Sequence, residues 1–485
     1  MKKAFIICLS LLLAVTAFVG CEDFEEDRFG IREDSTETEY IDTEAGLETD
    51  GDETVYAIET SDPEQTDETA FEETEEPIVE ETTEFILEEI TEIEDVTEEP
   101  EILCDIWDGS VATSFEGGKG TEKDPFVIAS AEQFAFFAQT VNSKTQFTDK
   151  VYTLYCDIDL GGLEWTPIGT PDNRFSGIFD GNGHTIYNLK ITVDDEHNTQ
   201  TEFNYGWNRI NVGLFGVCEG SVIKNLNISG ADVTVEEMVD GKEQLFAGIL
   251  MGQMYTVKEL SNIRLTDAEI TVDLAEERDG ANFIGGLCAI AQTDGGTEIR
   301  EIQTEIRVDI KRGYGRSNII GGIVGDLEAF GNCYVKNCAS YLSIDIGSKD
   351  CYMDGNDFGA FGRVGLDVQT FTFTNVFSKV TVNKENDFYN GFSAYDASAL
   401  IGYGLHYKST EGVRDGNYAF ENIYGCVEQI DPDTGEVVIN ENLYSFPYGI
   451  ICTEVNCIGC AVLPEDCGLD EDIWDLSDRS APRLK

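Results

Sequence analysis

The chain has 485 residues, of which 26% are charged, and its formal net charge at pH 7 is −64. A field of this sign repels nucleic-acid phosphates and anionic lipid surfaces, so nucleic-acid binding is disfavoured as a function. It is compatible with cations, basic partners or neutral glycans, and also with a role in solubility alone.

The first 21 residues predict export. Lys2 and Lys3 give a positive start, and residues 4–19 form an apolar stretch that is short for a membrane-spanning helix. The end of this stretch, Ala17-Phe18-Val19-Gly20-Cys21, resembles a bacterial lipobox, in which the cysteine is acylated and becomes the mature N-terminus. The resemblance implies a signal peptide over 1–20 and a lipid anchor on Cys21 at the extracellular face of the bacterial cell membrane. The alternative is cleavage after Ala17 and a secreted protein.

Residues 21–103 predict an acidic, disordered linker behind the lipidated cysteine. Residues 22–103 hold 35 Asp or Glu side chains, against Arg28 and Arg32 as the basic ones. A segment with so much like charge and few large apolar residues cannot bury enough surface to offset its chain entropy. Self-repulsion extends such a chain, so we expect a stalk that holds the rest of the protein away from the membrane.

Residues 104–190 predict an N-terminal cap for the folded part. Ser130-Ala131-Glu132-Gln133 has the pattern of a capping box, followed by apolar positions at helical spacing. This predicts a short capping helix. A strand is predicted over 152–160, and Asp180-Gly181-Asn182-Gly183 has the composition of a tight, hairpin-like corner.

Asp157 and Asp159 lie in the predicted strand. Alternation places Leu154, Cys156, Ile158 and Leu160 on one face and the two aspartates on the other. The aspartates are therefore expected to be solvated surface carboxylates. A calcium site is the alternative, but calcium requires six or more oxygen ligands.

Residues 191–485 contain a repeated unit. Each copy starts with glycines, continues with an apolar strand pattern that often contains Asn, and ends with alternating β-branched residues. The leading glycines are Gly213, Gly248, Gly285, Gly321, Gly359 and Gly402, at steps of 35 to 43 residues. Glycine suits tight corners or close backbone approach, and Asn suits a left-handed turn position. Because one unit cannot bury its own apolar face, stacked units are expected. The fold class predicted is all-β, as a right-handed parallel β-helix or β-solenoid.

This chain resembles the bacterial GLUG-repeat surface proteins. The resemblance rests on the repeats, on Gly120-Thr121 to Ile128, on Phe175-Ser176-Gly177-Ile178-Phe179-Asp180, and on a closing segment with Ile473-Trp474-Asp475 and Pro482-Arg483-Leu484. It implies a surface setting and a GLUG-like solenoid with a C-terminal cap. It implies little about activity, because a fold does not determine a function.

The segment 194–211 is the candidate ligand-binding site. Its sequence predicts an irregular insertion, and this insertion contains Phe203, Tyr205, Trp207 and Arg209. Exposed aromatic rings on such a loop can stack on a sugar or contact a partner. The alternative, which we favour because large aromatic side chains are usually buried, is that they pack against the end of the solenoid.

Three alternatives are open for the cysteines beyond Cys21. Cys156, Cys288 and Cys338 lie in apolar strand patterns and fit buried thiols. Export also allows disulfides, either between Cys333 and Cys338 or within the group Cys452, Cys457, Cys460 and Cys467. Zinc is the third alternative, but no histidine lies near that group.

These features favour a non-enzymatic, adhesin-like surface lipoprotein that binds a glycan or protein ligand and uses no cofactor or metal. His184, His197 and His406 are the only histidines, none in an H-E-x-x-H pattern, and no G-x-S-x-G motif occurs. The main alternative is a polysaccharide lyase or glycoside hydrolase, because β-helices carry such enzymes and carboxylates are plentiful here. A structural spacer without a ligand is the third hypothesis.

Overall fold

The structure is a computed structural model that describes the residues of the chain from 104 onward, with gaps. These are residues 104–143, 145–194, 201–204, 207–236, 243–274, 280–293, 296–313, 317–329, 331–346, 355–366, 370–384, 398–406, 417–430, 434–440 and 454–485. The predicted signal peptide, Cys21 and the acidic linker lie outside them. In the described part no helix is long and apolar enough to cross a membrane.

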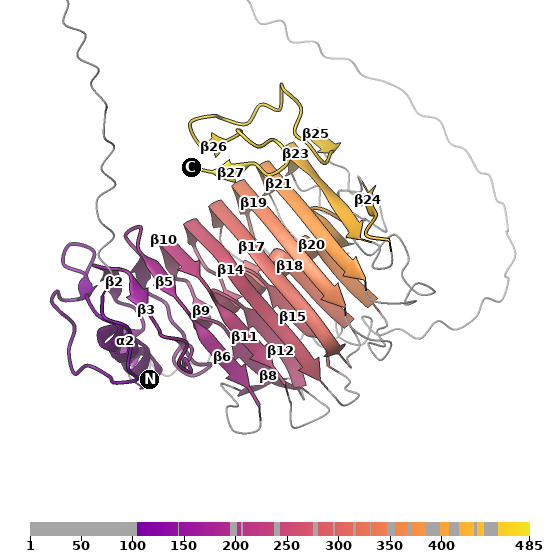
Figure 1. Ribbon diagram of the computed structural model, residues 1–485. Coiled ribbons are helices and arrows are strands. Elements are labelled where there is room, and N and C mark those ends of the chain that lie inside the picture. Colours follow the sequence, from indigo (N-terminus) through magenta and orange to yellow (C-terminus); the bar gives the residue numbers. More distant parts are fainter. Residues whose placement is uncertain are drawn as a thin grey trace, which may run out of the picture. The chain divides into compact units, whose positions relative to one another are not determined.

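In its described residues the protein is a parallel β-solenoid with one α-helix near the start (Figure 1), which confirms the predicted fold class. The first sheet contains β1 (Phe126–Ile128), β2 (Val151–Leu154), β3 (Ile158–Asp159), β4 (Ile178–Asp180), β5 (Thr185–Tyr187), β6 (Lys190–Val193), β10 (Val222–Ser229), β11 (Asp232–Val235), β14 (Glu259–Leu274), β17 (Thr297–Gly313), β19 (Cys333–Ile346), β21 (Thr370–Lys384), β23 (Asn417–Ile430), β24 (Val437–Asn440) and β25 (Glu454–Gly459).

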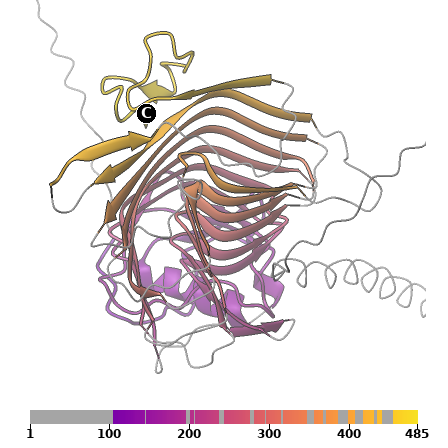
Figure 2. The same cartoon turned by 90° about the vertical axis from the view of Figure 1, so that its right-hand side faces the viewer.

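The second sheet contains β7 (Thr201–Asn204), β8 (Trp207–Val212), β9 (Phe215–Glu219), β12 (Glu243–Gly248), β13 (Met251–Tyr255), β15 (Asn282–Gly285), β16 (Cys288–Thr293), β18 (Ser317–Ala329), β20 (Gly355–Leu366) and β22 (Ile401–His406). Each turn of the solenoid adds a strand to the first sheet and then to the second. The strands of successive turns therefore pair in parallel and stack one above another (Figure 2).

The interior of the solenoid is apolar because alternate residues of each strand point into it. In β10, Ile223, Leu226 and Ile228 are fully buried. They pair in register with Leu260, Ile263 and Leu265 of β14. Burial of these aliphatic side chains in a continuous column stabilises every turn through its neighbours.

The asparagines of the repeats form a ladder at a bend in the first sheet. Asn225 and Asn262 both have left-handed backbone, with φ of 53° and 49°, and Asn262 Nδ2 donates to Asn225 Oδ1 over 3.0 Å. Asn337, Asn375 and Asn422 continue the ladder with Nδ2–Oδ1 distances of 2.9 Å. This confirms the predicted turn role for Asn. Glu301, with φ of 57°, occupies the corresponding place in β17.

The glycines of the repeats form a sharp bend in the second sheet. β18 is continuous across this bend, whereas the preceding turn is divided there into β15 and β16. A Cβ on Gly321 would lie 1.7 Å from the carbonyl oxygen of Val324, and one on Gly325 would lie 2.7 Å from that of Ile284. Only glycine fits such contacts, so the predicted close backbone approach is confirmed.

The N-terminal cap region contains helix α2 (Ala131–Ser143), followed by the 3₁₀ turn η1 (Thr145–Phe147). Ser130 caps the helix as predicted, since its Oγ accepts from Gln133 N at 3.3 Å. The return bond of the capping box is shifted by one residue, because Gln133 Oε1 accepts from Ala129 N at 2.8 Å. Phe134, Phe137, Ala138 and Val141 are buried. The Phe137 ring lies 4.1 Å from that of Tyr152, centroid to centroid, within an aromatic cluster that covers the first turn.

The closing segment lies across the outward face of the first sheet. Its strands β26 (Trp474–Asp475) and β27 (Arg483–Leu484) pair antiparallel, and Trp474 is fully buried. Arg483 Nη1 lies 2.9 Å from Glu305 Oε2 of β17, and the hydroxyl of Tyr424 in β23 donates to Cys467 O at 2.6 Å. The segment therefore fastens several turns to one another.

Candidate functional site

The predicted insertion at 194–211 is a β-hairpin where the structure describes it. β7 and β8 pair antiparallel, and β8 pairs in parallel with β12. The prediction of an irregular loop is therefore wrong for residues 201–204 and 207–211, which extend the second sheet. Tyr205 lies outside the described residues, as do the side chains of Phe203 and Trp207. Arg209 Cζ lies 5.7 Å from the centroid of the Phe246 ring, so this guanidinium packs on an aromatic face.

A surface pocket of about 440 Å³ lies elsewhere, at a corner of the first turns. Its walls come from four segments that are far apart in the sequence, and its lining residues are Ile106, Asp159, Gly161, Gly162, Asn188, Leu189, Lys190, Gly230 and Asp232. Pockets of a few hundred Å³ with several fixed polar groups are typical small-ligand sites. The pocket is open to solvent, and its fixed polar groups make it a candidate functional site.

Three stacked corners form one side of the pocket. Gly162 N donates to Asn188 O at 3.2 Å, and Asn188 N donates to Ser229 O at 3.0 Å. Gly162, Asn188 and Gly230 have positive φ values of 65°, 55° and 69°. Glycine and asparagine adopt this left-handed backbone at low cost, so these residue types allow the corners to stack.

Asp159 connects two of these corners through hydrogen bonds. Its Oδ1 accepts a hydrogen bond from Gly161 N and another from Asn188 Nδ2, each at 2.8 Å. Two donors on one carboxylate oxygen fix the positions of both corner segments. Asp159 therefore orients the other groups of the pocket in addition to lining it.

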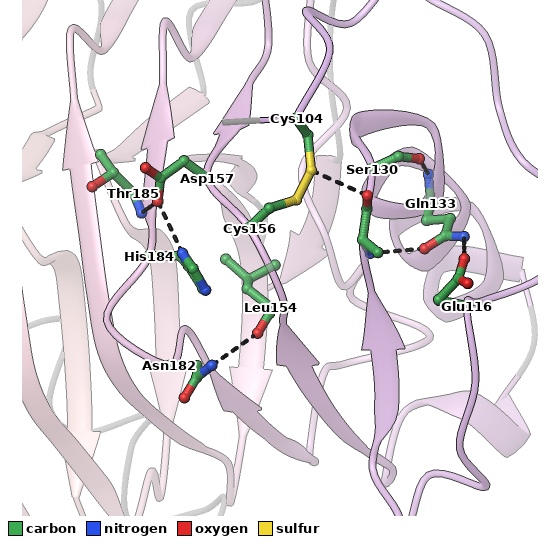
Figure 3. Close-up of a disulfide and its surroundings, with 11 residues drawn as sticks. Cys104, Glu116, Ser130, Gln133, Leu154, Cys156, Asp157, Asn182, His184 and Thr185 are labelled. Carbon is green, nitrogen blue, oxygen red and sulfur yellow. Dashed lines mark hydrogen bonds and ion pairs between the residues drawn. A yellow bond between two sulfur atoms is a disulfide. The ribbon is translucent and has the colours of Figure 1, made fainter. Parts of the chain in front are cut away.

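A disulfide holds the segment that carries Ile106 in place. Cys104 and Cys156 are bonded, and their Cα atoms are 5.9 Å apart (Figure 3). Cys104 N donates to Asp157 O at 3.0 Å, and Trp107 N donates to Asp159 O at 2.9 Å, so the chain from Cys104 runs along the β3 segment. Ile106, which is 60% exposed, forms the pocket wall on this segment.

The charges at the rim are partly neutralised. Lys190 Nζ lies 3.2 Å from Glu164 Oε1, and both side chains are partly exposed. Partial burial raises the pKa of Glu164, but hydrogen bonds from Thr192 and the contact with Lys190 outweigh this, and the net pKa is lowered. Glu164 is therefore an anion at neutral pH.

Asp157 differs from its prediction as a solvated carboxylate. It is only 4% exposed, and its Oδ1 accepts from Thr185 N at 2.8 Å and lies 3.1 Å from His184 Nδ1 (Figure 3). The predicted strand over 152–160 is divided into β2 and β3 by a bend at 155–156. The apolar residues are buried on one face as predicted, but the corner at 180–184 covers Asp157. This corner is tight, as predicted, although β4 and β5 beside it both pair with β10 and do not form a hairpin. In the part of the chain that is described, no group of three His, Cys, Asp or Glu could hold a metal ion.

The cysteines also differ in part from the prediction. Cys156 is not a buried thiol but half of the disulfide with Cys104, a pairing that the sequence did not suggest. Cys288 and Cys338 are buried thiols, as predicted, and Cys333 is a further one, so the pairing of Cys333 with Cys338 is wrong. Cys467 in the tail is a free, buried thiol as well, so a pair that includes it is wrong. Cys452 lies outside the described residues, and pairing among Cys452, Cys457 and Cys460 remains a prediction.

Comparisons with known proteins give limited likenesses. No family model matches the sequence. Over 147 residues the chain is 34% identical to a "Putative Gly-rich membrane protein" of Evansella cellulosilytica, a match that covers 30% of this chain and 15% of that protein. Over 140 residues it is 30% identical to halomucin of Haloquadratum walsbyi, covering 26% of this chain and 1% of that protein. The chain thus spans only a small part of both relatives.

Among solved structures, one match is the crystal structure of a "putative immunoglobulin A1 protease" from Bacteroides ovatus. The two chains are 16% identical, and the match covers 76% of this chain and 95% of that one with a TM-score of 0.39.

Proposed function

We propose that this protein is a lipid-anchored, GLUG-repeat surface protein that binds an extracellular glycan, without cleaving it, in the pocket beside the disulfide. The pocket itself is the observation that carries the proposal: it combines fixed polar groups with one exposed aliphatic side chain. Sugars present hydroxyl groups next to apolar C–H faces, so the combination of Ile106 with Asp159, Asn188 and Asp232 in one pocket suits them.

The rigidity of the pocket supports a binding role. Its polar groups stand on corners that are hydrogen-bonded to one another, and its Ile106 wall is held by a covalent bond. A site that is ordered before the ligand arrives loses little conformational entropy on binding. The repeated turns then serve as the scaffold that presents it.

Glu164 gives no support to the alternative of a polysaccharide-degrading enzyme. A general acid for glycoside cleavage requires a carboxyl group that keeps its proton near neutral pH, hence a raised pKa. The net pKa of Glu164 is lowered instead. Glu164 does not line the pocket, but it pairs with Lys190, which does.

The proposed location rests on the sequence. Cys21 would carry the acyl chains, and the acidic linker would hold the pocket away from the membrane. Growth with labelled palmitate should label the wild-type chain and leave Cys21→Ala unlabelled. Equal labelling of the two would place any acyl group elsewhere, and labelling of neither would favour secretion.

The binding test is a glycan array probed with the purified chain, with the length of each bound glycan measured afterwards. Retention of intact glycans is expected. Shortened glycans would overturn the proposal in favour of a lyase or hydrolase. A blank array, together with retention on protein matrices, would replace the glycan by a protein ligand.

A further inference from the structure

The strand β24 has an unusual degree of exposure. β24 lies at one edge of the first sheet. It pairs antiparallel with β23, and Val438 is opposite Gln429. Val437, Val438 and Ile439 are 52%, 58% and 48% exposed. Because successive side chains of a strand point to opposite faces, both faces of β24 carry apolar groups in solvent.

Edge strands in soluble proteins are usually covered or carry charged residues that prevent further pairing. At the other end of the same sheet, β1 is covered: Glu116 N donates to Val127 O, and Val127 N donates to Gly117 O, each at 3.0 Å. Within the described residues, β24 is not covered in this way and carries no charged side chain. Within the residues that are described it pairs only with β23, and Val437–Asn440 contains no charge and no proline.

We infer that β24 is a docking edge for a second copy of this chain, which adds its own β24 in antiparallel orientation. A register centred on Val438 places Val438 opposite its counterpart and Val437 opposite Ile439. Apolar and β-branched pairs of this kind stabilise antiparallel strands. The strand is thus self-complementary, as a two-fold symmetric contact requires.

Charge also favours this register. The chain carries a net charge of −64, so two copies repel one another wherever acidic surfaces meet. With Val438 at the centre, Glu436 faces Asn440, so within the described residues 434–440 no two carboxylates stand directly opposite. An uncharged strand is a place where such an acidic chain can approach its own copy closely.

The contact is small compared with a standard stable interface, so in solution the dimer should be weak. Chains held on one surface would pair more readily, because anchoring raises their effective concentration. This inference goes beyond the proposed function and does not depend on the pocket.

Charge-swapped variants of the purified full chain test the pairing by sedimentation at increasing concentration. Concentration-dependent dimerisation is expected for the wild type. V438K and V438E should each weaken it by roughly tenfold or more, because like charges would then face each other. An equal mixture of the two variants should restore it, because Lys and Glu would then be opposite.

V462K is the matched control, because Val462 is also 58% exposed but lies outside any strand. It should dimerise like the wild type. V438C should form an intermolecular disulfide, because directly opposed residues have the Cα spacing that a disulfide needs. A wild-type chain that stays monomeric at all concentrations, or a dimer that V438K leaves unchanged, would overturn the inference.

Discussion

The N-terminal cap region (104–190) and the repeated turns that follow are built in different ways. The cap region has a helix, an aromatic cluster and a disulfide, and its corners are individually shaped. The turns repeat the same structural arrangement: columns of aliphatic side chains inside, an asparagine ladder at one bend and glycines at another. The pocket is lined mainly by the cap region and reaches the first repeat only at Gly230 and Asp232.

The difference teaches where specificity can arise. A regular turn presents the same backbone at every level, so a ligand would find many equivalent places along it. The cap region breaks the repetition, and its covalent link fixes one unique arrangement of polar groups. We therefore expect changes in the turns to affect stability, and changes in the cap region to affect binding as well.

The largest effect on stability is expected from Gly321→Ala, which places a side chain in the glycine bend of the second sheet. The new Cβ would lie 1.7 Å from Val324 O, and the stacked turns leave the backbone little freedom to move. We expect the free energy of unfolding to fall by more than about 4 kcal/mol, as measured by urea denaturation. Gly117→Ala, where no atom lies within 4 Å, should change it by less than about 0.5 kcal/mol. Similar losses in the two variants would mean that the bend is not sterically closed.

Cys104→Ser removes the disulfide of the cap region. Loss of a disulfide with a sequence separation of 52 residues should cost about 2–4 kcal/mol and release the Ile106 wall. Glycan retention should fall with it. Reducing agent should bring the wild type to the level of the variant and should not alter the variant further. A variant with unchanged retention would show that this wall takes no part in binding.

High pH should weaken the repeated turns through their buried thiols. Burial raises the pKa of Cys333 and of Cys338 to about 12. Between about pH 9 and 12 the unfolded chain loses these protons while the folded chain keeps them, so stability is complete below this window and falls as the pH rises through it. The slope is about 1.4 kcal/mol per pH unit for each thiol. The double variant Cys333→Ala/Cys338→Ala should show a smaller slope in denaturation measured from pH 8 to 11, and an equal slope would contradict this origin.

Glu301→Asn would complete the asparagine ladder, and we expect it to have the smallest effect on stability. Glu301 lies between Asn262 and Asn337 in the ladder and holds a left-handed backbone that asparagine adopts more easily. Its contact with Arg300, 3.3 Å long, is partly exposed and therefore weak. We expect a gain of up to about 1 kcal/mol in denaturation experiments. Asn375→Ala, which removes two amide contacts, should move the midpoint the other way.

The sequence was sufficient to predict the solenoid because its periodicity is local. Alternation in Leu342, Ile344 and their neighbours, and glycine at fixed steps, each report on a few consecutive residues. The capping box before α2 is equally local. The hairpin at 201–212 was missed although its strands alternate, because its polar and aromatic residues resembled a loop.

The pocket could not be predicted in the same way. Ile106, Asp159, Lys190 and Asp232 meet only because the strands of different turns pair in one particular register. The disulfide was missed for a related reason: nothing in the spacing of Cys104 and Cys156 distinguishes this pairing from many others. Sequence reasoning chose the aromatic residues of 203–207 instead, since such side chains suggest ligand contact without any knowledge of register.

The central claim, that the pocket beside the disulfide binds a glycan, is tested most directly by measuring the affinity of the retained glycan for three chains. These are the wild type, the double variant Ile106→Ala/Asp232→Ala, and Trp207→Ala in the hairpin. Ile106 and Asp232 are exposed, so their replacement should leave the fold intact. We predict a loss of at least roughly tenfold for the double variant and little change for Trp207→Ala. Undiminished binding by the double variant, with loss in Trp207→Ala, would contradict the account and move the site to the hairpin.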